Sequence, residues 1–363
     1  MPKLPVIAVS GLHRGDNPQP GPAVIHSIRR IYPMTRIVGL SYDPLESGLF
    51  STHMDSVDVA FSLPFPAAGE EALIERIDEI SQIQRVDMII PCLDAEIPNY
   101  FKLAKQLWHR RIKVTLPTKQ SFERRAKKNL VRLASDAGIA VPRTIVADNL
   151  SEAYSAGAEI GYPLILKGRF YDARKVSSPA EVAAVFHQLV EVWGGPVLVQ
   201  QVVEGDEYDV AGFGDGQGEV VGSCAIRKML LTKAGKAFSG IVIADPELDD
   251  TVRRIIAALC WNGPFELEFI KSWRGYSLIE MNPRFPAWID FPSQMGCNLP
   301  AAIVERAMSL PQTPLSDCKA GRMFVRHCLD LVGDIADLAE LSVTGTLMRD
   351  TALNPLNQSE AAK

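Results

Sequence analysis

The chain has 363 residues, a formal net charge of −5, and a composition that is 47% hydrophobic and 22% charged. These values are typical of a globular protein of two or three domains with a large core. The acidic balance disfavours binding to a nucleic-acid backbone, and no apolar run reaches the roughly 18 residues that a membrane helix requires.

The six cysteines are scattered and form no Cys-x-x-Cys pair, which argues against a zinc or disulfide framework and suits a reducing compartment. The first residues lack the apolar core of a signal peptide. We therefore expect a cytoplasmic protein that binds neither nucleic acid nor a membrane. We leave open whether it forms a homodimer.

The first third of the chain alternates between short apolar runs and amphipathic segments. This alternation predicts a Rossmann-like parallel sheet, whose ligands would lie beyond the carboxyl ends of its strands. Asp94 and Glu96 follow the third strand, so they either face a substrate or serve as surface or helix-capping acids. The predicted strands are 6–9, 36–40 and 86–91, and the predicted helices are 23–31 and 72–83.

The middle of the chain begins with a basic helix, predicted from Ser121 to Ala137, with Gly138 as its C-cap. Further on, Gly161-Tyr-Pro-Leu-Ile-Leu-Lys167 reads as a turn and then a strand that ends in a lysine. The glycines at 212–218 favour a hairpin turn over a phosphate-binding loop.

The most informative pattern is a hairpin predicted around the three-residue loop Trp273-Arg274-Gly275. In that register Glu268 lies opposite Glu280, and Glu266 lies opposite Asn282. Side chains alternate along a strand, so these four residues share one face. Opposed carboxylates repel each other, and oxygen ligands suit Mg²⁺, so we expect a cation among them. A solvated acidic face is the alternative.

The string Glu280-Met-Asn-Pro-Arg284 closely resembles the metal-binding motif of the ATP-grasp superfamily. The resemblance covers residues 6–310 and is strongest after Gly138. It implies that Glu268, Glu280 and Asn282 hold Mg²⁺ or Mn²⁺ and that Arg284 contacts phosphate. The implied fold combines an α/β, Rossmann-like parallel sheet domain with a two-subdomain, α+β ATP-grasp module. The implied domains are 1–116 (Rossmann-like), 117–198 (linker helix and small lid subdomain), 199–345 (large subdomain) and 346–363 (polar tail).

The same resemblance assigns residues to ATP and to substrates. Lys127, with Lys128 as the alternative, and Lys167 would contact phosphates. The adenine hinge would be Gln201, Val202 and Val203, and the ribose ligand Glu207. Arg227 and Lys228 would face the γ-phosphate or an acyl phosphate. A substrate pocket would involve Asp94, Glu96, Trp288 and Asp290, although core packing explains Trp288 equally well.

Residues 168–175 depart from the family, because they hold a single glycine where a glycine-rich flap covers the phosphates in relatives. We predict that Arg169, Arg174 or Lys175 replaces the backbone donors with a side chain, on a lid that is mobile without nucleotide.

The implied activity is that of an ATP-dependent ligase, nearest to the carbamoyl-phosphate-synthase-like branch. It would join a small-molecule carboxylate to an amine or related nucleophile through an acyl phosphate, releasing ADP and phosphate. A kinase or carboxylase-type enzyme on the same fold is the first alternative, and a non-catalytic nucleotide-binding protein is the second.

Overall fold

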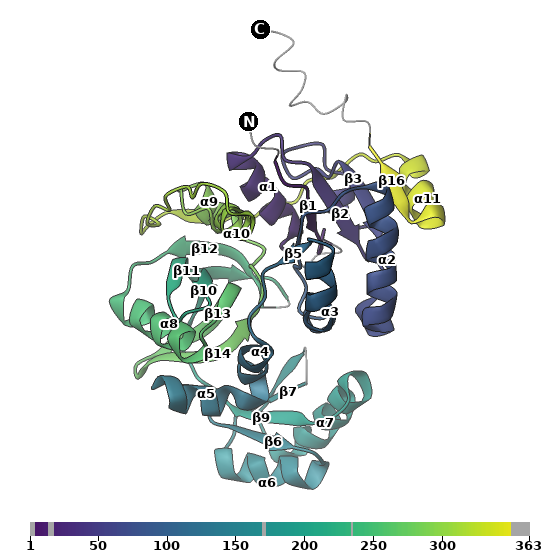
Figure 1. Cartoon of the computed structure of the whole chain (residues 1–363). Coiled ribbons are helices and arrows are strands. Elements are labelled where there is room, and N and C mark those ends of the chain that lie inside the picture. Colours follow the sequence, from purple (N-terminus) through teal and green to yellow (C-terminus); the bar gives the residue numbers. More distant parts are fainter. Residues whose placement is uncertain (1–3, 14–17, 169–171, 234, 350–363) are drawn as a thin grey trace.

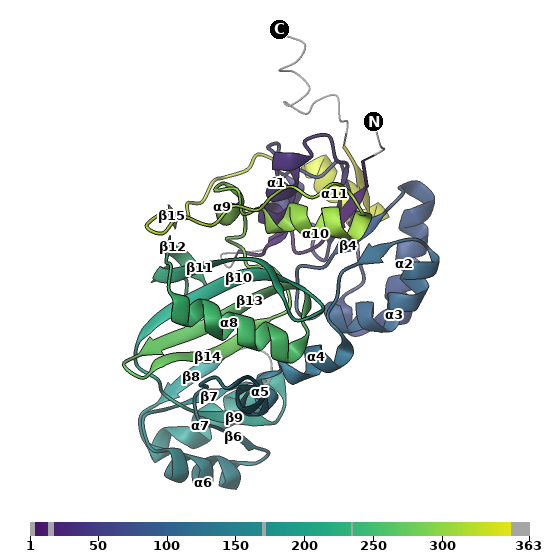
Figure 2. The same ribbon diagram turned by 60° about the vertical axis from the view of Figure 1, so that its left-hand side comes forward.

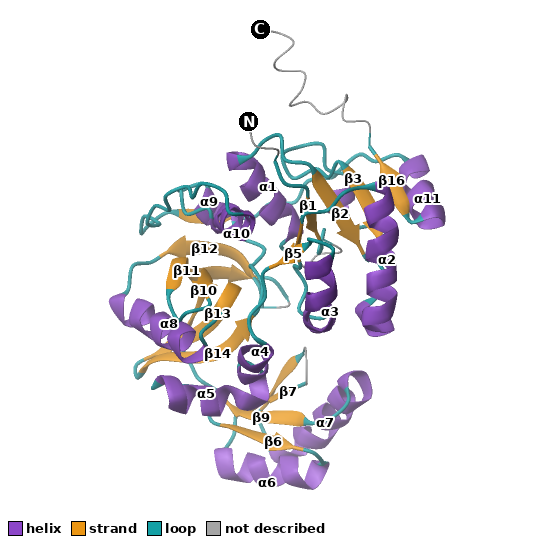
Figure 3. Cartoon of the chain, in the orientation of Figure 1, coloured by secondary structure: helices purple, strands orange, loops and turns teal. Residues whose placement is uncertain are grey.

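The structure is a computed structural model that describes residues 4–13, 18–168, 172–233 and 235–349. In this part of the chain, the strands form three sheets, with helices packed against them (Figures 1 and 3). No helix within the described ranges has both the length and the apolar composition needed to cross a membrane.

The N-terminal sheet has the strand order β16-β3-β2-β1-β4-β5. Strands β1 to β5 run parallel, and β1 pairs with β2 on one side and with β4 on the other. This confirms the predicted Rossmann-like sheet. Its parallel strands are Ile7–Val9, Ile37–Ser41, Val59–Ser62, Met88–Ile90 and Lys113–Val114. Its helices are α1 (Gly21–Ile31), α2 (Gly69–Ile83) and α3 (Ile97–His109), with short 3₁₀ turns at Ser47–Leu49 and Pro66–Ala68.

The end of the described chain returns to this first sheet. Helix α11 (Ile335–Thr344) leads into β16 (Thr346–Met348), which pairs antiparallel with β3. Leu341 and Leu347 are buried in the core that includes α1 and β1. Residues 346–348, which we expected to begin a polar tail, therefore add an edge strand to the N-terminal sheet.

The smallest sheet is antiparallel, with the order β6-β9-β7-β8. Helices α6 (Leu150–Ile160) and α7 (Pro179–Trp193) pack on it and enclose a core of its own. In Figure 1 this unit lies at the opposite end of the molecule from α1. Its strands are Thr144–Ala147 (β6), Leu164–Lys167 (β7), Ala173–Val176 (β8) and Val197–Gln201 (β9).

The largest sheet has the order β14-β13-β10-β11-β12-β15 and is antiparallel throughout. Helix α8 (Pro246–Leu259) covers one face, as Figure 2 shows. Helix α10 (Leu299–Met308) packs on α1. The core around these two helices contains residues of both the large sheet and the N-terminal sheet, so the two sheets share one apolar core. Its strands are Asp206–Asp215 (β10), Val220–Leu231 (β11), Ala237–Val242 (β12), Asn262–Ser272 (β13), Gly275–Asn282 (β14) and Met323–Val325 (β15).

The predicted basic helix is interrupted. It begins as α4 (Lys119–Arg124), breaks at a 3₁₀ turn (Lys127–Asn129) and resumes as α5 (Leu130–Ala137). Asn129 lies at the break, where its side-chain amide donates 2.7 Å to the carbonyl of Glu123, which also accepts from the backbone amide of Ala126. Gly138 ends α5 in the left-handed conformation, as predicted.

Candidate active site: the acidic face of the large sheet

The β13–β14 hairpin places its acids as predicted, by a route that the sequence did not show. Ser272 pairs with Gly275, so the loop has two residues rather than three, and that alone would shift the register. A bulge at Ile279 restores it, because Glu268 pairs with Glu280 while the next residue of β13 pairs with Leu278. Because of the bulge, Leu278 rather than Ile279 lies opposite Phe269 and is buried in the core.

Lys228 on β11 lies at the centre of the acidic face. Its ammonium is 2.9 Å from Asp209, 2.9 Å from Glu268 and 3.3 Å from Glu207. Burial alone would lower the pKa of Lys228, but Asp209 and then Glu268 outweigh it, so the pKa is raised and the lysine stays charged. In turn, Lys228 overcomes the effect of burial on Glu268 and lowers the pKa of that carboxyl.

Asn282 and Arg284 order the other side of this face. The amide of Asn282 donates to Glu266 at 3.1 Å and to Glu268 at 3.2 Å. Arg284 pairs with the buried Glu266, and its Nε lies 3.8 Å from Asp94. Glu266 therefore fixes both the amide and the guanidinium, and Arg284 links the hairpin to the loop after β4.

Two lysines from outside the large sheet complete the cluster. Lys127, in the turn between α4 and α5, lies 3.3 Å from Glu280. Lys167, at the end of β7, is 8% exposed. Burial lowers the pKa of Lys167, and Lys127 adds to this, while Glu280 and Glu268 oppose it. The small sheet and the interrupted helix thus each bring one cation to the carboxylates of the hairpin.

The donor set fits a hard cation such as Mg²⁺. Glu268 and Glu280 offer carboxylate oxygens, and Asn282 offers an amide oxygen on the same face. Burial raises the pKa of Glu280 despite Lys127, so an additional cation nearby would favour its ionised form. The described residues contain no cluster of three or more His, Cys, Asp or Glu side chains that would enclose a metal by itself. Such a set suits an ion that takes one or two carboxylates and completes its shell with phosphate and water.

The residues expected at the adenine hinge lie where the small sheet meets the large one. Gln201 ends β9, where its side chain is exposed, and its backbone amide donates 2.9 Å to the carbonyl of Arg143. Val202 and Val203 are half-buried in the link to β10. Glu207 follows on β10 and belongs to the acidic face through Lys228.

Three of the expected site residues are not brought to this face. Arg227 pairs directly with Tyr208, so it lies on the opposite side of the sheet from Lys228, and it is exposed beside Asp206. Glu96 is fully buried. Asp290 forms a bidentate ion pair with Arg30, which fastens α9 (Asp290–Ser293) to α1.

The surroundings of Glu96 show why it cannot face a substrate. It accepts hydrogen bonds from Ser10 at 2.5 Å, from Tyr42 at 2.7 Å and from the backbone amides of Cys92 and Leu93. It therefore ties together the loops that follow β1, β2 and β4. Glu96 does occupy the N-cap position of α3, as one of the expected roles has it, but its side chain makes no capping hydrogen bond and is buried, so it is neither a substrate contact nor a surface acid.

Trp288 and Asp94 do lie close to the acidic face. Trp288 is 4% exposed, stacks on Phe324 with ring centroids 6.4 Å apart, and lines a cavity that Arg284 also lines. Oδ1 of Asp94 is buried, and in the described structure it has no hydrogen-bond partner.

Two residues of this region were missed by the sequence analysis. Asp209 could have been found, because it lies two positions after Glu207 on a strand and must share its face. Lys236 carries no such signal. It reaches Glu266 and Arg284 only because the β11–β12 turn and the irregular pairing of these strands bring it there.

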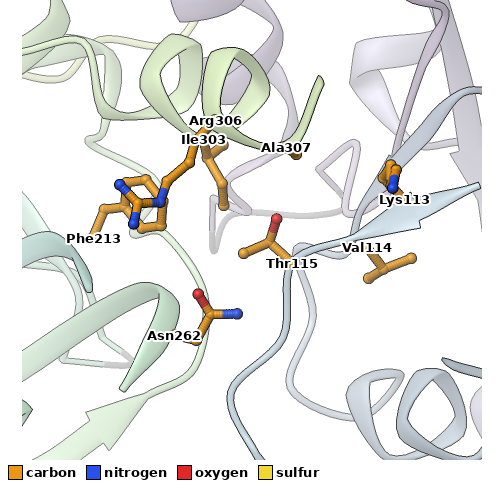
Figure 4. Close-up of a pocket in the computed structure, with 8 residues that line it drawn as sticks. All are labelled: Lys113, Val114, Thr115, Phe213, Asn262, Ile303, Arg306 and Ala307. Carbon is orange, nitrogen blue, oxygen red and sulfur yellow. The ribbon is translucent and has the colours of Figure 1, made fainter. Parts of the chain in front are cut away.

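A second cavity, of about 240 Å³, is larger than the one that Trp288 and Arg284 line, and it lies away from the acidic face (Figure 4). It lies at the far end of β10 and β13 from the acidic face. None of the expected site residues lines it. Its lining consists of Lys113, Val114, Thr115, Phe213, Asn262, Ile303, Arg306 and Ala307.

Comparison with known proteins supports the fold independently of this geometry. The chain is 26% identical over 258 residues to the carbamoyl phosphate synthase large chain of Hyperthermus butylicus, a match that covers 66% of this chain and 23% of that protein. No protein-family model matches the chain.

Solved structures match over most of the chain. The biotin carboxylase domain of Hydrogenobacter thermophilus 2-oxoglutarate carboxylase has a TM-score of 0.64 at 18% identity, covering 84% of this chain and 70% of that domain. L-amino acid ligase from Bacillus licheniformis has a TM-score of 0.64 at 16% identity, covering 86% and 76%. N5-carboxyaminoimidazole ribonucleotide synthetase from Thermotoga maritima has a TM-score of 0.58 at 16% identity, covering 88% and 79%. The three sheets and these similarities show that the chain has the ATP-grasp fold.

Proposed function

We propose that the protein is an ATP-dependent ligase that activates a small-molecule carboxylate as an acyl phosphate and transfers the acyl group to an amine or related nucleophile. The observation that carries this proposal is the convergence of Lys127, Lys167 and Arg284 on the carboxylates of one hairpin face. Cations around paired acids suit a metal-bound triphosphate, since phosphoryl transfer depends mainly on positioning and charge neutralisation.

Each group has a role in this reaction. Glu268, Glu280 and Asn282 would hold Mg²⁺, which when bound neutralises charge on the phosphates. Lys167 would hold a phosphate as a compact point charge. Arg284, fixed by Glu266, would face the phosphoryl group as it leaves ADP.

The reaction balances without a protein nucleophile. An oxygen of the substrate carboxylate attacks the γ-phosphorus, the bond to ADP breaks, and an acyl phosphate forms. The amine nitrogen then attacks the acyl carbon, and phosphate leaves. Keeping both substrates in one closed site supplies much of the acceleration.

Asp94 supports an amine as the second substrate. Its Oδ2 lies 3.8 Å from Arg284, while its Oδ1 is buried and lacks a hydrogen-bond partner among the described residues. An unpaired buried acceptor is costly, and an ammonium group would satisfy it. Asp94 would then hold the amine next to the acyl phosphate and take up its proton.

The known proteins of similar fold support both a ligase and a second candidate. The Hydrogenobacter thermophilus domain was solved with MgADP and bicarbonate and as a dimer, which is consistent with ATP and Mg²⁺ as cofactors and with a homodimer here. Because that domain is a biotin carboxylase, a carboxylase-type reaction is the alternative, and it too would release ADP. Product analysis separates the two, since a ligase needs an organic acid and an amine, whereas a carboxylase needs bicarbonate.

A further inference from the structure

A small enclosed cavity lies beside the acidic face. Its volume is about 20 Å³, enough for a group the size of one or two water molecules. It is bordered by residues 18 and 20 before α1, by the start of β12 and by the segments that follow β14 and β15. The residues that matter for its chemistry are Pro18, Lys236, Glu266, Arg284, Trp288 and Arg326.

Two buried donors in the cavity wall are unused. In the described structure, neither Nε1 of Trp288 nor Nε of Arg326 has a hydrogen-bond partner. Trp288 is 4% exposed, so solvent does not reach its indole freely. Buried donors are nearly always satisfied, because leaving one unpaired costs its full desolvation free energy. Both side chains line the same cavity, so one acceptor group inside it would satisfy them together.

The charges in the wall specify the sign of that group. Among the described lining residues Glu266 is the one carboxylate, and it is paired with Arg284. Lys236 donates to the carbonyl of Pro18 at 3.0 Å, its one side-chain hydrogen bond within the described residues, and its pKa is lowered to about 8 by burial and then by Arg284. Burial likewise lowers the pKa of Arg326. Within the described wall, Lys236 and Arg326 therefore have no anionic partner of their own, so an anion would be bound favourably.

We propose that this cavity anchors a second carboxylate of the acid substrate, so that the enzyme acts on small dicarboxylic acids. The proposal rests on the proposed function and names the substrate class of that site. A carboxylate held between Trp288, Arg326 and Lys236 has its oxygens occupied by donors, so it is not the one that attacks phosphorus. The attacking carboxylate must lie outside the cavity, toward Glu280 and the nucleotide.

The test measures binding apart from catalysis. The full chain, with Mg²⁺ and a non-hydrolysable ATP analogue, is titrated calorimetrically with unbranched dicarboxylates of three to six carbons and with the monocarboxylates of equal length. Trp288→Phe keeps the ring and deletes the N–H donor, and Lys236→Met removes one cation. Trp273→Phe is the matched control, because Trp273 is 87% exposed in the hairpin loop.

We expect at least one dicarboxylate to bind more tightly than its monocarboxylate by about tenfold or more, and Trp288→Phe to weaken it by a similar factor. Trp273→Phe should not change the affinity. Equal binding of both acid types, equal affinity of Trp288→Phe and the native chain, or preferential binding of inorganic phosphate would overturn the proposal. ADP release with the same acids is measured in parallel. Dicarboxylate binding without ADP release would support the anchor but not the ligase activity, whereas ADP release without a preference for dicarboxylates would support the ligase activity but not the anchor.

Discussion

Glu268 on β13 lies directly opposite Glu280 on β14, and each carboxylate is paired with a lysine from a different part of the chain. Lys228, from β11 on the other side of β10, holds Glu268, while Lys127, from the interrupted helix, holds Glu280. Two opposed carboxylates would otherwise repel each other. Glu268 is therefore held by a lysine of the same sheet, whereas Glu280 is held by a lysine from outside the sheet.

Replacement of Glu280 by Gln tests the metal assignment. The change removes one charge from the proposed Mg²⁺ ligands but keeps the size of the side chain. We expect Mg²⁺-dependent turnover to fall by about 100-fold or more, the scale of losing a main electrostatic group in an active site. The melting temperature should change little, because the substitution relieves repulsion with Glu268 while losing the Lys127 pair. Glu219→Gln, at an exposed position on the β10–β11 hairpin, is the control. Full activity of Glu280→Gln at saturating Mg²⁺ would refute the assignment.

Lys167 should dominate nucleotide affinity. Lys167→Ala deletes a charge-assisted contact to phosphate, which we expect to weaken ATP binding by about 1.5–3 kcal/mol. Lys127→Ala should weaken it less, because that lysine is already engaged by Glu280. Calorimetric titration of ATP into each variant makes the comparison, with Lys113→Ala as an exposed control. An affinity of Lys167→Ala equal to that of the native chain would show that the lysine is only structural.

The pairing of β8 with β7 separates two of the three residues that we predicted to contact the nucleotide from the lid. Arg169 lies outside the described residues, but Arg174 and Lys175 belong to β8, which pairs with β7. Lys175 pairs with Ile165 and so shares the face of Lys167, whereas Arg174 pairs with Leu166 on the face that carries the apolar core. We therefore expect Lys175→Ala to lower kcat/KM for ATP at least about fivefold, the loss of roughly one hydrogen bond, and Arg174→Ala to leave it unchanged.

Limited proteolysis supplies a second measurement on the same segment. If the stretch between Lys167 and Val176 is a lid, then ATP and Mg²⁺ should slow its cleavage. Equal cleavage rates with and without nucleotide would identify it as a fixed hairpin. Equal kinetic effects of Lys175→Ala and Arg174→Ala would show that the facing of β8 does not matter.

The pH dependence of acid binding follows from Lys236. Its pKa of about 8 lies below the ordinary value for lysine, so the ammonium loses its proton between pH 7 and 9. Affinity for a dicarboxylate should therefore fall as pH rises through about 8. Lys236→Arg, which stays charged, should bind with no such fall. Among the described residues, the charged or titratable groups around Lys236 are Arg284, Glu266, Asp94, Glu268, His13 and Arg326.

The same pKa shift has a consequence for stability. Between about pH 8 and the ordinary lysine pKa the unfolded chain binds the proton and the folded chain does not, so the free energy of unfolding should rise with pH in that window. Denaturant titrations at pH 7.5 and 9.5 measure this. A rise that persists in Lys236→Met would assign it to another group.

The sequence was sufficient where a local pattern decides the structure. Period-two alternation placed Glu268, Glu280 and Asn282 on one face, and strand–helix alternation predicted the parallel sheet. The sequence was insufficient where contacts between segments far apart in the chain decide the structure. The same alternation should have separated Arg227 from Lys228, which the resemblance had assigned together. Neither the burial of Glu96 among three loops nor the return of residues 346–348 to β3 has a local signature, because each depends on contacts between segments far apart in the chain.

Trapping of the acyl phosphate tests the central proposal most directly. The full chain is incubated with ATP, Mg²⁺, small carboxylates including the dicarboxylic acids, and hydroxylamine, and both the hydroxamate and the nucleotide products are quantified. The proposed mechanism predicts that one acid stimulates the release of ADP, with an equal amount of hydroxamate, and that Glu280→Gln forms neither. Release of AMP, or ADP release that no carboxylate stimulates and that yields no hydroxamate, would contradict it.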